Sequence, residues 1–341
     1  MLFSLLAVIV LGGIAWLVAP NMPGFFGIIL PYAAVLVFLA GFVWRIMNWA
    51  KSPVPFRIPT TGGQQRSLDF IKPARLDSPF TKAGTIGRMI LEVLLFRSLF
   101  RNTKAELKDG PRMVYWSSKW LWIFALIFHY SFLIIFIRHF RLFLGVDVLP
   151  FCLEAIDKVD SMLQVGIPRF YMSDALILAG LLFLLCRRLF DYKIRYISLP
   201  GDYFPLFLLL GIAGSGVLMR YFMKGDIATV KTFIVNLVSF GPISASGLPP
   251  IFFLHLLFIS TLLIYFPFSK LMHMGGVFLS PTRNLPNNSR AVHHENPWNP
   301  PKKFHTYAAY EDDFRDLMDE AGLPLEITPE EAAARAGAAK E

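Results

Sequence analysis

The apolar stretch Trp120–Arg141, WLWIFALIFHYSFLIIFIRHFR, decides the fold expected for this chain of 341 residues. A hydrocarbon core about 30 Å thick is crossed by about 20 helical residues, so this stretch is long enough to span a membrane. It also carries His129 and His139, and ionisable side chains inside a membrane span are rare and costly. We therefore expect both imidazoles to have specific partners inside a helical bundle.

A second histidine pair, His255 and His273, lies in the last apolar run. On a continuous helix, a spacing of ten residues is about 15 Å along the axis and about 80° in azimuth, whereas eighteen residues is about 27 Å and five turns. If the two helices are antiparallel, His129 lies level with His273 and His139 lies level with His255. Because the two rises differ, tilted helices and offset ligands must absorb the difference. Pro267 in the last apolar run is expected to kink or break that helix.

Two levels of facing histidines predict two b-type haems, each bound by one axial histidine from each of the two helices. A single buried membrane histidine more often hydrogen-bonds to a neighbouring helix, but four histidines that pair by level favour haem iron. No Cys-x-x-Cys-His motif is present, which excludes covalent c-type haem. Cys152 and Cys186 are the only cysteines, too few for an iron–sulfur cluster or a cysteine zinc site.

The composition predicts an all-α polytopic membrane bundle. The chain is 55% hydrophobic, and its mean hydropathy is +0.52. Its apolar runs recur at membrane length, which predicts six transmembrane helices. The expected spans are Leu2–Ala19, Phe25–Met47, Trp120–Arg141, Tyr171–Leu189, Asp202–Tyr221 and Pro250–Met272. The fifth span contains Gly211, Gly214 and Gly216, which favour close helix packing or the approach of a flat macrocycle.

Charge sets the expected orientation in the cell inner (cytoplasmic) membrane. The net charge is +9, but the basic residues cluster in loops beside the spans and no DNA-binding motif accompanies them, so no nucleic-acid partner is expected. By the positive-inside rule, residues 48–119 form a basic cytoplasmic loop and both termini are cytoplasmic. The expected parts are an N-terminal transmembrane hairpin (1–47), this loop, a dihaem bundle (120–274) and a cytoplasmic tail (275–341).

The loop and the tail each contain a candidate interaction element. Helical spacing of Ile86, Ile90, Val93, Leu94 and Arg97 predicts an amphipathic helix on the membrane surface or against a partner.

In the tail, a capping box of Thr328 and Glu331 predicts a helix in an arm that docks a soluble partner. His293, His294 and His305 are expected to be solvated, because no matching set of ligands accompanies them.

Three basic residues near the histidines have two open interpretations. Arg138, Arg141 and Lys270 pair with haem propionates, or they only orient the spans by reaching the interface.

The order and spacing of His129, His139, His255 and His273 resemble the cytochrome b subunit of membrane nitrate reductases, the NarI-like family, over about residues 25–274. The additional first span, the basic loop and the long tail are more similar to the DsrM-type subunits of DsrMKJOP complexes in sulfate-respiring organisms. The resemblance implies an inner haem on His129 and His273 and an outer haem on His139 and His255. It also implies menaquinone as a redox partner, a cytoplasmic DsrK-like iron–sulfur subunit related to heterodisulfide reductase, and further membrane and periplasmic subunits.

The leading hypothesis is therefore a dihaem cytochrome b subunit that transfers electrons between menaquinol or menaquinone and the iron–sulfur subunit in dissimilatory sulfate or sulfite reduction. No side chain is expected to be catalytic, because the redox chemistry belongs to the cofactors. The alternatives are a nitrate reductase gamma subunit, a heterodisulfide reductase cytochrome b subunit and a haem-free anchor. A proton-coupled transporter is an alternative of another class, although no internal repeat and no acidic residue in the centre of a span supports it.

Overall fold

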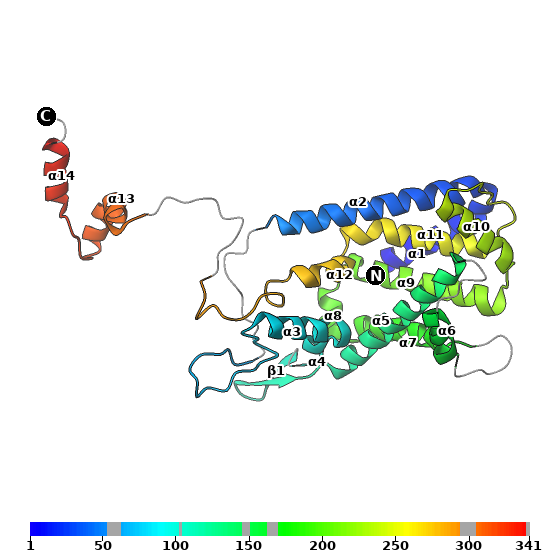
Figure 1. Ribbon diagram of the computed structural model, residues 1–341, viewed down its shortest axis with the longest axis horizontal. Helices are drawn as coiled ribbons and strands as arrows, with labels where there is room; N and C mark the ends of the chain where they lie inside the picture. Colours follow the sequence, from blue (N-terminus) through cyan, green and yellow to red (C-terminus); the bar gives the residue numbers. More distant parts are fainter. Residues whose placement is uncertain (53–62, 102–103, 145–150, 162–169, 294–304, 339–341) are drawn as a thin grey trace. The chain divides into compact units, whose positions relative to one another are not determined.

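The computed structural model describes residues 1–52, 63–101, 104–144, 151–161, 170–293 and 305–338. They fall into two compact units, Met1–His294 and Glu295–Glu341, and each is described by itself. Figure 1 shows the helices of the first unit side by side in a bundle. The only sheet in the described residues has two strands, so the expected all-α class is confirmed.

Five described helices are long and apolar enough to cross a membrane, which supports the expected multi-pass architecture. With their flanking turns, these spans are Leu2–Asn21, Phe25–Ala50, Lys119–Leu142, Pro200–Phe222 and Pro250–Phe268. Their α-helical parts are α1 (Leu2–Leu17), α2 (Leu30–Ala50), α5 (Lys119–His139), α9 (Pro200–Val217) and α11 (Pro250–Tyr265).

The fourth expected span, Tyr171–Leu189, corresponds to α7, Met172–Phe190, which is not among these five. This helix carries Asp174 in its first turn and Arg187 and Arg188 in its last turn. The charges at both ends leave a shorter apolar centre than in the other spans. The expected count of six is therefore not confirmed, although a helix lies at the position of the fourth expected span.

Neighbouring helices of the first unit pack in the order α5, α7, α9, α11 and α2, with α1 against α9 and α11. Small residues allow this close packing. In a membrane the hydrophobic effect does not drive helices together, so close van der Waals contact between them matters more. A Cβ on Gly180 of α7 would come within 3.2 Å of the Phe128 backbone on α5. A Cβ on Gly211 of α9 would come within 2.8 Å of the Phe258 ring on α11, so Gly211 serves helix packing.

The last expected span is interrupted between its two histidines. After α11, a 3₁₀ turn at Phe266–Phe268 is followed by extended Ser269, a second 3₁₀ turn at Lys270–Met272 and the short α12, His273–Gly276. Pro267 has no N–H to continue a helical ladder, so the predicted break at this residue is confirmed. The rise of about 27 Å that a continuous helix would give between His255 and His273 therefore does not apply to this span.

The basic loop is partly folded. The predicted amphipathic helix is α3, Lys82–Leu95, capped by the Thr81 hydroxyl, which accepts from the Gly84 N–H. The short α4, Arg97–Phe100, and an antiparallel hairpin of β1, Lys104–Lys108, and β2, Arg112–Trp116, follow it. The hairpin was not expected, because its short strands carry no clear alternation of apolar and polar residues.

A buried arginine joins α3 to the chain beyond α12. Arg88 is 3% exposed and donates to the carbonyl oxygens of Asp77, Arg283 and Leu285. Burial lowers the pKa of this guanidinium. The basic loop and the segment after His273 therefore form one folded cap rather than two separate, solvated segments of the chain.

Three further short helices lie in the connections of the first unit. They are α6 (Phe151–Asp160), α8 (Tyr192–Ile197) and α10 (Ile227–Ser239). Neither α6 nor α10 is predicted by the pattern of membrane spans, because both helices lie between expected spans and are too short to cross a membrane.

The second unit contains α13, Tyr307–Glu320, and α14, Pro329–Ala338. The predicted capping box is confirmed: the Thr328 N–H donates to the Glu331 carboxylate, and the Glu331 N–H donates to the Thr328 hydroxyl. His305 is exposed and lies 3.1 Å from Asp313, and His293 in the first unit is exposed. His294 lies outside the described residues.

We predict that Glu311 makes the folding of the second unit sensitive to acid. Its carboxylate accepts hydrogen bonds from the Glu326 and Ile327 N–H groups, and the first of these bonds is the main cause that lowers its pKa. The stabilisation is therefore present above the carboxyl's unfolded pKa and is lost as the pH falls through the lower, folded value. Limited proteolysis of the full chain at pH 7 should cut Glu311→Ala faster than wild type within residues 306–331.

The exposed Glu320→Ala change is the control for Glu311→Ala and should leave the cleavage rate unchanged. Acidification should bring the wild-type rate towards that of Glu311→Ala. Equal cleavage of the two variants at pH 7 would contradict this role of Glu311.

Candidate functional site

The structure brings the four predicted histidines together in the two expected pairs. The His129 and His273 ring centroids are 6.1 Å apart, with an interplanar angle of 79°. The His139 and His255 centroids are 6.4 Å apart, with nearly parallel planes at 13°. The interruption at Pro267 lets one pair form near the middle of α5 and the other at its C-terminal end, even though the spacings along the chain are ten and eighteen residues.

A hydrogen bond at Nδ1 holds each imidazole. The Nδ1–H of His129 donates to the Ala125 carbonyl oxygen at 2.7 Å, and that of His139 donates to the Ile135 carbonyl oxygen at 2.6 Å. The His273 Nδ1–H donates to the Lys270 carbonyl oxygen at 2.9 Å. A carbonyl oxygen accepts only, so these three rings carry their proton on Nδ1 and keep the Nε2 lone pair free.

His255 is oriented by a serine on a neighbouring helix. The Ser215 hydroxyl of α9 donates to the Ile212 carbonyl oxygen at 3.0 Å, and it lies 2.9 Å from the His255 Nδ1. Because its own proton is used, the hydroxyl accepts from the His255 Nδ1–H. All four rings therefore have the tautomer in which Nε2 is available to bind a metal ion.

The spacing of the rings fits one metal ion between the members of each pair. Two metal–imidazole bonds of about 2 Å, with about 1.1 Å from each nitrogen to its ring centroid, place the centroids about 6 Å apart. No cluster of three or more histidine, cysteine or acidic side chains suited to a metal ion occurs in the described residues. Two protein ligands for each ion match an iron whose remaining ligands come from a porphyrin.

The surroundings of the pairs also suit a flat macrocycle. Within the described bundle, α5 packs closely on α7, whereas α11 packs on α1, α2 and α9, so the histidines of α5 and α11 face each other across helices that are not tightly packed together. A Cβ on Gly216 would lie 3.4 Å from the His255 Cε1, so a larger residue there would crowd this imidazole. The residues present therefore fit haem.

Two phenylalanines contact His129 edge-on. The rings of Phe96 and Phe128 each have their centroid 4.9 Å from that of His129. Phe96 has a left-handed backbone, with φ of 48°, at the junction of α3 and α4. Trp122 and Tyr130 of α5 hold this junction by donating to the Leu95 and Leu94 carbonyl oxygens. The contact of Phe96 with His129 could not be predicted from the sequence, because only the fold brings the basic loop to this histidine.

An ion pair supports His273 from α9. The Lys270 ammonium lies 2.7 Å from the buried Asp202 carboxylate, and the Lys270 carbonyl accepts the His273 Nδ1–H. Asp202 also accepts from the Leu199 N–H at the start of α9. The start of α9 is thereby tied to the short turn that presents His273.

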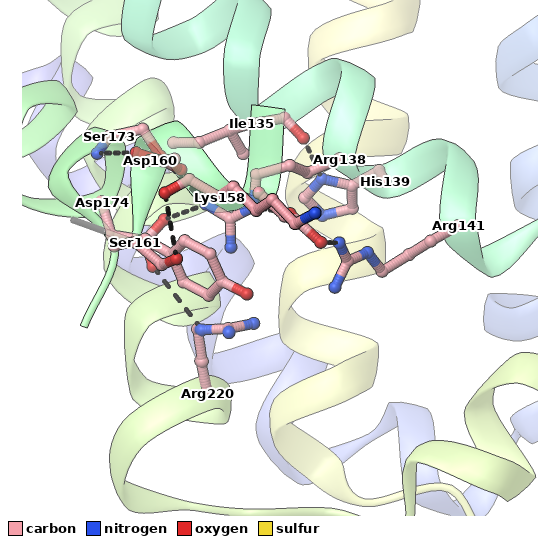
Figure 2. Close-up of polar contacts among 12 residues, drawn as sticks. Ile135, Arg138, His139, Arg141, Lys158, Asp160, Ser161, Ser173, Asp174 and Arg220 are labelled. Atoms are coloured by element: carbon pink, nitrogen blue, oxygen red, sulfur yellow. Dashed lines mark hydrogen bonds and ion pairs between the residues drawn. The ribbon is translucent and has the colours of Figure 1, made fainter. Parts of the chain in front are cut away.

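A buried cluster of charges lies beside His139, at the ends of α5, α6, α7 and α9 (Figure 2). One Arg138 guanidinium nitrogen donates to Asp160 at 2.9 Å, to the Ser173 hydroxyl at 2.9 Å and to Asp174 at 3.3 Å. The Tyr221 hydroxyl donates to the second Asp174 oxygen at 2.7 Å, and the Arg220 Nε lies 3.8 Å from the same oxygen.

The basic residues considered for haem propionates have protein partners instead. Arg138 pairs with Asp160 and Asp174, Arg141 with Asp157, and Lys270 with Asp202. Their charges are therefore neutralised by carboxylates of the chain itself, and the propionate interpretation gains no support.

The first unit is a membrane helical bundle in which two pairs of histidines face each other. This arrangement is typical of polytopic membrane proteins that bind metal cofactors between their helices. The model of the nitrate reductase gamma subunit family matches residues 92–288, which contain all four histidines, and the chain belongs to this family. A relative from Archaeoglobus fulgidus, named Hdr-like menaquinol oxidoreductase cytochrome b-like subunit, is 49% identical over 282 residues, which are 81% of this chain and 83% of the relative.

A relative of the same name from Archaeoglobus profundus is 41% identical over 278 residues, which are 80% of this chain and 82% of the relative. The resemblance seen in the histidine spacing is thus confirmed at the level of the family.

We predict that Ser215→Ala weakens cofactor binding at His255 while the fold remains intact. Loss of the acceptor leaves the His255 Nδ1–H without its oriented partner, and changes of this kind cost about 10–100-fold in metal affinity. Titration of the apoprotein with haem should show one weakened site and one unchanged site. Ser260→Ala, a buried change on α11, is the control and should bind as wild type. Equal affinities of wild type and Ser215→Ala would contradict the role of Ser215.

Proposed function

We propose that this chain is a dihaem cytochrome b subunit of a menaquinol oxidoreductase complex. The observation that carries the proposal is the pair of histidine sites, 6.1 and 6.4 Å between centroids, in which every Nδ1 is held by a hydrogen bond and every Nε2 is free. His129 and His273 would hold one haem, and His139 and His255 the other.

The residues of the chain have defined tasks in this function. Bound haem iron would supply reversible one-electron chemistry. The carbonyl oxygens of Ala125, Ile135 and Lys270 and the Ser215 hydroxyl orient the four imidazoles. Phe96 and Phe128 cover His129 with apolar rings, which lowers the local polarity and keeps water away from that site.

The names of the two relatives support menaquinol as the redox partner and an Hdr-like complex as the setting. With the additional span, the basic loop and the long tail, they favour a DsrM-type role in sulfate or sulfite reduction, with a DsrK-like iron–sulfur subunit and further subunits. The same names make a nitrate reductase or a haem-free transporter the weaker alternatives.

The charge distribution supports an orientation in the cytoplasmic membrane with both termini inside. The basic residues of the loop at 48–119 then lie on the cytoplasmic face. The His129 and His273 site is the inner one, next to the cap that Arg88 holds together. This cap and the tail at 275–341 would receive the soluble iron–sulfur subunit.

Reconstitution of the complex in liposomes tests this function. With a menaquinol analogue as donor, quinol oxidation at the outer site should release protons on the outer side while electrons cross inward, so turnover should generate a membrane potential. Acidification of the cytoplasmic-face compartment without any potential would place quinol oxidation at the inner site instead. Absence of haem from the purified complex would refute the function as a whole.

A further inference from the structure

A cavity of about 540 Å³ lies between α5, α6 and α7. Its walls are mainly aliphatic, with Leu126, Ile134, Ile156 and Leu176 among them. This volume lies in the range of sites that bind small organic ligands, about 300–1,000 Å³. Tyr130, Val159 and Leu176 at its edge are 42%, 62% and 42% exposed, so the cavity opens sideways, towards the surface that faces lipid in a membrane-spanning bundle.

Three buried polar residues also line this cavity: Ser131 on α5, Asp160 on α6 and Ser173 on α7. Ser131 is 3% exposed, and its hydroxyl makes no hydrogen bond to any residue of the described chain. This hydroxyl is not among the fully buried polar atoms, so it is accessible from the cavity and can hydrogen-bond to a polar group of a ligand there.

Asp160 has spare hydrogen-bonding capacity at the polar end of the cavity. One carboxylate oxygen accepts from the Ser173 N–H at 2.8 Å, and the other accepts from the Ser173 hydroxyl at 2.6 Å and from Arg138 at 2.9 Å. A carboxylate has about four lone-pair positions, so one remains for a further donor. Arg138 and Ser173 fix the carboxylate in place, as Figure 2 shows.

We propose that this cavity binds the headgroup of a quinol, with one ring hydroxyl donating to Asp160 and Ser131 hydrogen-bonding to the headgroup from α5. A quinol joins a flat aromatic ring bearing two hydroxyl groups to a long apolar chain, which matches aliphatic walls, buried polar groups and an opening towards lipid. The inference rests on the proposed function for its choice of a quinol, and it adds the place and the contacts of the headgroup.

A lipid acyl chain is the competing occupant of an apolar cavity at this depth. It would fill the aliphatic part, but it offers no donor to Asp160 and no partner to Ser131. The two buried polar groups therefore favour the quinol.

Photolabelling of the whole complex tests the proposal with a naphthoquinol that carries a diazirine and a short isoprenoid chain. Label is expected on the α5 and α7 peptides that line the cavity. Ser131→Leu should reduce it about tenfold, because the leucine fills the cavity and removes a polar partner. Leu133→Phe, a lipid-exposed change on α5 outside the cavity, should label as wild type. If Ser131→Leu does not accumulate, Ser131→Ala should still reduce labelling severalfold.

The haem spectrum is recorded on the same samples. Label elsewhere in a haem-loaded complex, or label unchanged by both Ser131 variants, would overturn the quinol site and leave the proposed function standing. Loss of label in the variants with the haem spectrum intact would support the site. If a diazirine-bearing phosphatidylcholine labels the cavity and the naphthoquinol does not displace it, the cavity is an acyl-chain site and the proposal fails.

Discussion

Alanine in place of His129 or His273 is expected to remove one haem and leave the other, and alanine in place of His139 or His255 is expected to do the reverse. The members of each pair lie 6.1 and 6.4 Å apart, so an iron between them loses one of its two protein ligands in either single variant. A pyridine haemochrome assay should find about half of the wild-type haem per chain in all four variants, because each retains one complete site. The two variants of one pair should share a spectrum that differs from that of the other pair.

His305→Ala is the matched control, because His305 is an exposed histidine of the second unit. It should keep the full haem content. Retention of all haem in the four variants would refute the ligand assignment, and complete loss in all four would indicate that the bundle collapses without any one imidazole.

Among substitutions that remove a buried charged side chain from the first unit, Arg138→Ala is expected to cause the largest loss of stability. The Arg138 side chain is 8% exposed and neutralises Asp160 and Asp174, which are 3% and 10% exposed. Removing one partner of a buried ion pair leaves uncompensated charge and costs about 3–5 kcal/mol. Thermal unfolding of the purified protein in detergent should therefore show a clearly lower midpoint.

Lys158→Ala is the control for Arg138→Ala. Lys158 pairs with Glu154 on α6, but both side chains are more than half exposed, and such pairs contribute about 0–1 kcal/mol. Similar small shifts in both variants would show that the cluster beside His139 adds little to folding.

Much of the bundle could be predicted because a membrane span is recognised from the hydropathy of consecutive residues. Apolar runs of sufficient length, the break at Pro267 and the cap at Thr328 each depend on neighbouring residues alone. The pairing of the histidines was also predictable, because antiparallel helices bring residues together in a fixed order.

The parts that could not be predicted depend on contacts between distant segments. Ser215 and His255 are forty residues apart, and Phe96 reaches His129 only after the basic loop folds against α5. The carboxylate partners of Arg138 come from α6 and α7, and α6 lies between two expected spans. No local pattern distinguishes these residues from others of their type.

The difference in rise between the two histidine spacings is absorbed where the last span is interrupted. A continuous helix from His255 to His273 would carry the second histidine too far along the bundle to meet His129. Extended Ser269 and the 3₁₀ turns on either side of it change both the rise and the direction of the chain. The sequence marked the break at Pro267, but it did not specify the turns that follow.

The reduced-minus-oxidised optical spectrum of the purified protein, with a haem count by the pyridine haemochrome method, tests the central claim most directly. The arrangement of His129, His139, His255 and His273 predicts a b-type spectrum and two haems per chain. A protein that contains no haem, or whose haem gives a c-type signature, would contradict it.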